Sequence, residues 1–163
     1  MASKLRVNQI EPVNGIPTGG GGGIIQVKMT QTINSGSQYS TGSGTYVDVT
    51  GYNCSITPTS TTSKILVTLN PIFLLNNGSG TTQKVALKLL RGTQTLLDQN
   101  DFCTYQVGNG QADYLGIPGY FQYLDSPGSI DPLTYKVQVK QHAGGGTTYL
   151  QTTSSIMLQE VSA

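Results

Sequence analysis

The chain contains one histidine, His142, which stands just before the glycine run 144–146. A nucleophilic triad needs a base held between a nucleophile and an orienting carboxylate. The sequence has no G-x-S-x-G elbow and no cysteine-centred motif to accompany this histidine. We therefore expect His142 to be a structural residue at the edge of a loop, and we expect that the protein is not an enzyme.

The acidic residues offer little metal or acid–base chemistry. The chain has eight of them, and no pair is marked out for glycoside hydrolysis. The densest cluster, from Asp98 to Asp101, has the oxygen ligands for part of a calcium site. Short segments of this composition more often form turns that satisfy their own polar groups. We interpret 98–101 as such a turn, and we expect no metal and no cofactor.

The two cysteines, Cys54 and Cys103, are far apart in sequence, and each lies in a strand-like run. They form no Cys-x-x-Cys pair that would suggest zinc. Without a cysteine framework or a secretion signal, we interpret both as reduced thiols in or near the core. A disulfide between them is the alternative.

The composition argues against two classes of partner. Charged residues make up 10% of the chain, against roughly 25% in an ordinary soluble domain. The net charge is +1 and no run of lysine or arginine occurs, so we expect no nucleic-acid partner. The apolar stretches are only strand-sized, and the N-terminus lacks the apolar region of a signal peptide. We expect no membrane partner and no signal peptide.

Five consecutive glycines, 19–23, divide the chain into an arm at 1–18, a hinge at 19–23 and a head at 24–163. This run is not a phosphate-binding loop, because it lacks the following lysine and leads into a strand-like segment. The arm is too short to bury its own apolar residues, so we expect it to attach the head to a partner. A frayed terminus is the alternative. The predicted attachment residues are Leu5, Arg6, Val7, Asn8 and Ile10.

The head reads as an all-β domain with no helix. Val85, Leu87 and Leu89 alternate with Lys84 and Lys88, which is the period of a half-buried strand. Turn signals recur every 8–15 residues or so, the spacing of a sandwich or jelly roll. We predict an antiparallel jelly-roll sandwich preceded by an extended N-terminal arm, with a loop at 35–44 and a break at Gly51. The predicted strands are 24–29, 45–49, 52–56, 64–69, 84–90, 94–97, 120–124, 133–140, 147–150 and 155–161.

Nine tyrosines and no tryptophan are present. Tyrosine gives a large contact area at low entropy cost, which suits both subunit interfaces and sugar stacking. The absence of tryptophan weakens the sugar-platform interpretation, so we favour interface or core positions. Tyr46 is also in or beside a loop, but the predicted interface or glycan contacts are Tyr39, Tyr105, Tyr114, Tyr120 and Tyr149.

Seven short segments, in order, carry a resemblance to a known family. They are 23–27, 46–51, 55–60 running into 63–67, 89–92, 123–127, 134–139 and 156–161. Read together, they resemble the trimeric jelly-roll heads of bacteriophage tail-fibre and related virion proteins, which are similar in shape to tumour-necrosis-factor-like heads. The segment 4–10 also looks like the short N-terminal segments that precede such heads.

The resemblance implies a homotrimer whose arm attaches to another virion protein, and it carries over no catalytic residue. It implies a bacteriophage structural protein, a short tail-fibre-like or adaptor appendage, made in the host bacterial cytoplasm and located in the virion. Unlike long fibres, this chain has no shaft between arm and head. A capsid decoration or cement trimer is therefore one alternative, and a module that recognises a host surface glycan is another.

Overall fold

The computed structural model describes residues 23–31, 39–77, 82–106 and 113–162. The arm, with Leu5, Arg6, Val7, Asn8 and Ile10, lies outside the described residues, as do the first four hinge glycines. All the regular elements described are strands, and no helix long and apolar enough to cross a membrane occurs among these residues. The strands are β1 (Ile24–Gln31), β2 (Tyr39–Thr41), β3 (Val47–Ile56), β4 (Lys64–Asn70), β5 (Ile72–Asn77), β6 (Gln83–Arg91), β7 (Gln94–Tyr105), β8 (Asp113–Pro118), β9 (Phe121–Asp125), β10 (Leu133–Ala143), β11 (Thr147–Leu150) and β12 (Ser155–Val161).

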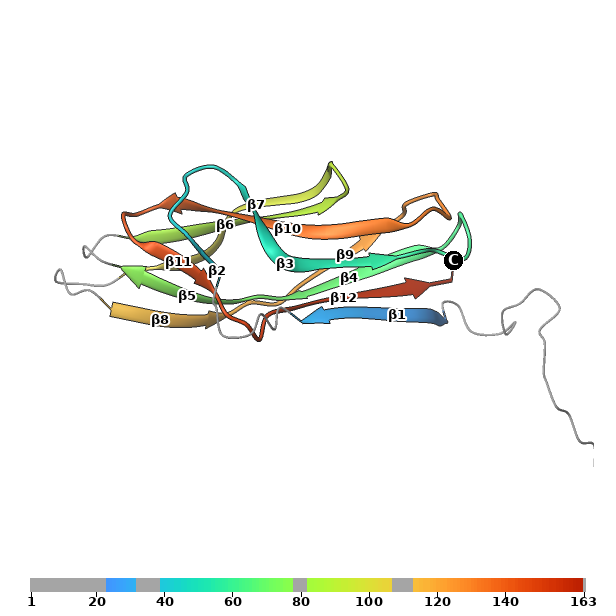
Figure 1. Ribbon diagram of the computed structural model, residues 1–163, viewed down its shortest axis with the longest axis horizontal. Helices are drawn as coiled ribbons and strands as arrows, with labels where there is room; N and C mark the ends of the chain where they lie inside the picture. Colours follow the sequence, from blue (N-terminus) through green and yellow to red (C-terminus); the bar gives the residue numbers. More distant parts are fainter. Residues whose placement is uncertain (1–22, 32–38, 78–81, 107–112, 163) are drawn as a thin grey trace, which may run out of the picture.

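The strands form an elongated sandwich of two layers (Figure 1). One layer, which we call the long layer, joins two four-stranded sheets end to end, in the orders β1-β12-β4-β9 and β2-β11-β5-β8. The other, the second layer, is the sheet β3-β10-β6-β7. Every strand pair is antiparallel. The chain passes back and forth between the layers, as in a jelly roll, which confirms the predicted fold class.

The long layer is interrupted at Pro71, where its two sheets meet. Pro71 separates β4 from β5 and lacks the N–H that would continue a ladder. The backbone N–H of Gly119 donates to the Pro71 carbonyl at 2.6 Å, and the N–H of Gln151 donates to the Ile72 carbonyl at 2.8 Å. The Ser154 hydroxyl accepts from the Ile72 N–H at 2.9 Å. The two sheets therefore act as one surface despite the interruption.

The core lies between the layers. Val85, Leu87 and Leu89 on β6 of the second layer are buried, while Lys84 and Lys88 lie outside. Tyr52 and Tyr135 are fully buried, and each hydroxyl has an acceptor. Tyr52 donates to the Ser155 carbonyl at 3.0 Å and Tyr135 donates to the Asp125 carboxylate at 2.7 Å. Cys54 and Cys103 are free and buried, as predicted for reduced thiols.

Three local predictions were wrong. The segment 35–44 was expected to be a loop, but it contains β2, which pairs with β11. Gly51 does not end a strand: it adopts a φ of 80° inside β3, next to a register shift against β10, so the strand continues through a bulge. The segment 98–101 is not a turn, because it lies within β7. The sequence analysis also missed β5 and β8.

The start of the head is held by the end of the chain. The Gly23 N–H donates to the Ser162 hydroxyl at 3.0 Å, and the Ser162 N–H donates to the Gly23 carbonyl at 3.0 Å. β1 continues from this point along the edge of the long layer by pairing with β12. The last hinge glycine is thus fixed beside the C-terminal strand.

Candidate interaction surface

The two outer faces of the sandwich differ in charge. The outer face of the second layer carries most of the ionic side chains, and we call it the charged face. Lys136 Nζ lies 2.9 Å from the Asp48 carboxylate, Lys88 Nζ lies 3.2 Å from Asp98, and Lys84 Nζ lies 3.3 Å from Asp101. These pairs join β10 to β3 and β6 to β7 across neighbouring strands. The charged face is therefore a self-neutralised, solvated surface.

Tyr46 occupies the centre of one cluster on the charged face. The Lys88 ammonium lies 4.0 Å from its ring centroid, and the Lys140 ammonium lies 4.4 Å away. Its hydroxyl donates to Asp98. That hydrogen bond, with the nearby ammonium of Lys88, lowers the pKa of the Asp98 carboxyl. These contacts explain why the segment 98–101, expected to be a turn, is anchored in a strand.

His142 lies near the end of β10, with Nδ1 3.1 Å from the Asp101 carboxylate. The hydrogen bond from His142, and then the contact with Lys84, lowers the pKa of Asp101. Both His142 and Asp101 are exposed, so the arrangement is a surface ion cluster. In the described part of the chain, no three His, Cys, Asp or Glu side chains come together in a way that could hold a metal ion.

The outer face of the long layer is different, and we call it the uncharged face. Burial of Ile156 and Leu158 on β12 and of Ile65, Val67 and Leu69 on β4 assigns their alternating neighbours to this face. Of the side chains that the structure describes there, only Lys64, at the start of β4, is charged. The apolar members are Val27, Met29, Leu66, Ile72, Leu74, Tyr114, Leu124, Tyr149, Met157 and Val161.

The predicted tyrosines do not form one site. Tyr39 and Tyr105 pack against the core, and burial raises the pKa of Tyr39. Tyr114 and Tyr149 meet on the uncharged face, with ring centroids 6.5 Å apart. Tyr120 is 65% exposed and lies between β8 and β9. The sequence therefore identified tyrosines of the uncharged face and its edge, together with two that are partly buried.

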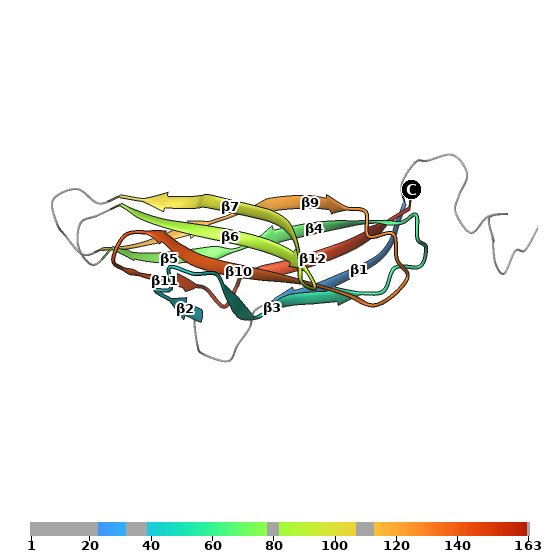
Figure 2. The same cartoon turned by 90° about the horizontal axis from the view of Figure 1, so that it is seen from above.

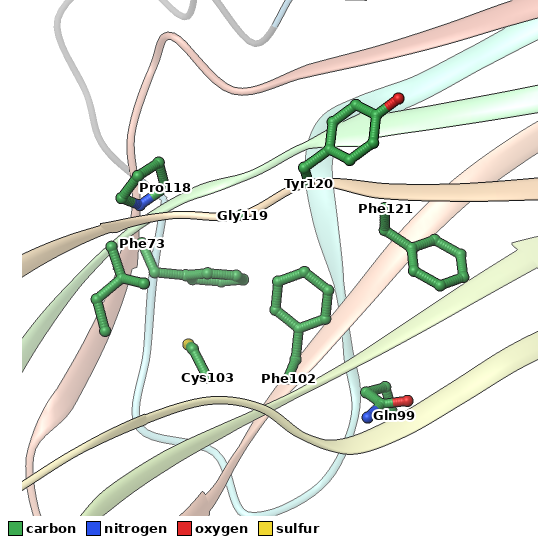
Figure 3. Close-up of a pocket in the computed structure, with 9 residues that line it drawn as sticks. Phe73, Gln99, Phe102, Cys103, Pro118, Gly119, Tyr120 and Phe121 are labelled. Atoms are coloured by element: carbon green, nitrogen blue, oxygen red, sulfur yellow. The ribbon is translucent and has the colours of Figure 1, made fainter.

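Figure 2 shows β7 and β9 along the same long side of the sandwich. A pocket of about 350 Å³ opens between β7 and the β8–β9 edge of the long layer (Figure 3). All three phenylalanines of the chain line it: Phe73, Phe102 and Phe121. Phe73 and Phe102 meet edge to face, with centroids 5.9 Å apart. Tyr120 points outward at the mouth (Figure 3). We call this the phenylalanine pocket, and the sequence analysis missed it.

Two further residues define the wall of the phenylalanine pocket. Gly119 has no side chain, and a Cβ there would lie 2.7 Å from a ring carbon of Phe102. The ring therefore occupies the space that any other residue would fill. Cys103 also lines the pocket, and burial raises its pKa to about 12, so that the thiol stays protonated at neutral pH. Most of the side chains that line the pocket are apolar, and the Gln99 amide is a polar group on its lining.

Comparisons with known proteins add similarities of shape. No protein-family model matches the chain, and no curated protein matches it. Among solved structures, the chain is similar to a protein in the structure of infectious bursal disease virus Gt strain. The identity is 12% over 82% of this chain and 31% of that chain, with a TM-score of 0.47. It is also similar to Eiger TNF from S. frugiperda, at 12% identity over 82% of this chain and 90% of that chain, again with a TM-score of 0.47.

A third similarity is to the infectious bursal disease virus VP2 subviral particle, at 13% identity over 82% of this chain and 32% of that chain, with a TM-score of 0.45. The chain thus spans about a third of the length of these viral proteins. No family follows from likenesses at this level. The bacteriophage part of the resemblance stays a prediction.

Proposed function

We propose that the protein is a structural component of a virion, a small homotrimer that its N-terminal arm attaches to a larger particle. The observation that carries this proposal is the segregation of charge between the two faces. Among the side chains that the structure describes, the charged face carries four lysines and three aspartates, whereas the uncharged face carries a single lysine at its margin. A large apolar surface of this kind marks an interaction site.

The uncharged face is the surface that we assign to contact between copies. It lies on the strands of the long layer, so no loop has to become ordered when two copies associate. Burial of a large apolar side chain contributes roughly 1.5–3 kcal/mol, and the face offers several such residues in adjacent rows. Low charge also removes the repulsion between identical copies. The number of copies in the assembly, three, is taken from the resemblance to the trimeric heads of bacteriophage proteins.

The arm supplies attachment in this proposal. Gly23 is fixed beside Ser162, so all three arms of a symmetric trimer would leave the same end of the assembly. Three arms acting together bind far more strongly than one, because the second and third contacts become intramolecular. A tail, neck or capsid position fits the proposal equally, and the role is structural rather than catalytic.

Charge introduced on the uncharged face tests the proposal. Leu66→Lys with Met157→Lys should convert the assembled protein into a folded species of 17.3 kDa, the mass of one chain, as measured by light scattering. Thr50→Lys is the matched control, because Thr50 is exposed on β3 in the second layer, and it should leave the assembly unchanged. An assembly that survives the paired lysine substitutions would contradict the proposal.

A further inference from the structure

The exposed large apolar residues of the described chain fall into two groups and one isolated residue. One group is on β1, where Ile24, Ile25, Val27 and Met29 are 43–61% exposed. The other is at β8–β9, where Tyr114, Leu115, Tyr120 and Leu124 are 41–65% exposed. Ile130 stands alone in the turn before β10. In the strand orders of the long layer, β1 is at one edge and β8–β9 at the other.

The two groups have complementary shapes. Tyr120 of the β8–β9 group lines the phenylalanine pocket, which opens in the side of the sandwich, and the rest of the group lies along the same edge of the long layer. The β1 group protrudes, and its most exposed member is Met29 at 61%. Methionine is flexible, fills irregular apolar gaps and makes favourable sulfur–aromatic contacts. A two-fold contact between two β1 groups would leave the hole unfilled, whereas head-to-tail packing fits the protrusion into the hole.

The directions of the two groups favour a closed ring. Met29 pairs with Met157, whose neighbours Ile156 and Leu158 enter the core, so Met29 points out of the long layer. The pocket opens at the opposite edge, between the layers. Packing a face of one copy against an edge of the next turns each copy relative to the last. When this rotation, about an axis along the strands, divides a full turn, its repetition closes a ring.

Strand register adds an independent match. In a ring whose axis runs along the strands, a given residue has the same position along that axis in every copy. Met29 lies in one row with Met157, Thr68 and Gln122, next to Phe121 of the pocket. Val27 lies in one row with Gln159, Leu66 and Leu124. Met29 and Val27 are therefore each level with an apolar feature at the far edge.

We propose that Met29 of one copy enters the phenylalanine pocket of the next copy, with Val27 against the neighbour's Leu124. This inference rests on the proposed self-association and specifies its geometry as a head-to-tail ring. The pocket is then a built acceptor for a second copy of this chain, and Gly119 is needed because it lets Phe102 form the wall.

Cysteine cross-linking tests the geometry. A chain with both Met29→Cys and Tyr120→Cys should form covalent products that end at three chains under mild oxidation, and neither single variant should do so. The native Cys54 and Cys103 are buried and present in every variant, so the single variants report their contribution. Cross-linking by Met29→Cys alone would reveal a two-fold contact and overturn the proposal, and a ladder beyond three chains would overturn the closed ring.

A second set of variants keeps the test falsifiable. Met29→Asp should weaken association at least tenfold, Met29→Leu should retain it, and Ile130→Asp, at a similarly exposed site, should have no effect. If the intact chain assembles but neither the cross-link nor the Met29→Asp effect is found, this inference fails while the proposed self-association stands. If the intact chain is a monomer, both fail. The dye 1-anilinonaphthalene-8-sulfonate binds exposed apolar pockets. If it binds in the phenylalanine pocket of the assembled protein, that pocket is not filled by Met29, and this inference is overturned.

Discussion

Glu160 provides a sharp stability test, because it is a fully buried carboxylate held by uncharged donors. One of its oxygens accepts from the Gln26 amide at 2.6 Å. The other accepts from both the backbone N–H and the hydroxyl of Thr59, each at 2.7 Å. These contacts join β12 to β1 and to the turn that precedes β4. Glu160→Gln keeps the shape of the side chain but replaces one acceptor with a donor.

The expected cost follows from those contacts. A hydrogen bond to a charged group contributes about 1.5–3 kcal/mol. The glutamine side chain has one acceptor oxygen fewer than Glu160, and it lacks the negative charge that strengthens the remaining hydrogen bonds. We expect Glu160→Gln to lower the free energy of unfolding by about 2–3 kcal/mol at pH 7. Asp131→Asn is the matched control, since Asp131 is an exposed carboxylate in a turn, and it should change the free energy by less than about 0.5 kcal/mol. Urea denaturation measures both.

The loss of stability caused by Glu160→Gln should depend on pH. Burial acts to raise the pKa of Glu160, but the hydrogen bonds from Gln26, Thr59 and Ser63 outweigh it and hold the pKa below its ordinary value. A carboxyl whose pKa is lower in the folded state stabilises the fold above its unfolded pKa, and this contribution is lost as the pH falls through the folded pKa. The difference between the natural chain and Glu160→Gln should therefore shrink below about pH 4. A difference that is absent at pH 7, or constant down to pH 3, would refute this reasoning.

Three further predictions concern the core, the pocket and the arm. Asp125→Ala removes the acceptor from a partly buried guanidinium, that of Arg91, and from a buried hydroxyl, that of Tyr135, so it should cost about 3–5 kcal/mol in urea denaturation. Gly119→Ala should cost about 1–3 kcal/mol, because the added methyl would lie 2.7 Å from Phe102; Gly116→Ala, which meets nothing within 4 Å, is its control in thermal denaturation. Deleting 1–18 should leave a folded trimer that no longer joins the particle, and normal incorporation would contradict the attachment role.

Much of the fold could be predicted because the strands of the second layer have one solvent-exposed face and one buried face. On β6 and β10, lysines alternate with core residues, and this alternation gave the strands directly. β5 was missed because its continuous apolar run follows Pro71, and β8 because Gly116 and Pro118 are unfavourable in strands. Gly51 was predicted as a break since glycine ends many strands, and the structure instead uses its positive φ for a bulge.

The interaction surface was less accessible to sequence analysis. Tyr114, Tyr120 and Tyr149 were identified from residue type, but nothing in the sequence separates them from the partly buried Tyr39 and Tyr105. The phenylalanine pocket draws on β5, β7 and β9, and no local spacing links residues so far apart. The low total charge was visible at once. The near-absence of charge from one face depends on which strands share a layer, which the sequence pattern did not give.

The most direct test of the account is the mass of the intact chain in solution. Light scattering at micromolar concentration should give three times 17.3 kDa, about 52 kDa, at both low and moderate salt. Salt should have little effect, because the proposed contact is apolar rather than ionic. A stable species of 17.3 kDa under these conditions would contradict the claim that the uncharged face joins copies of this chain.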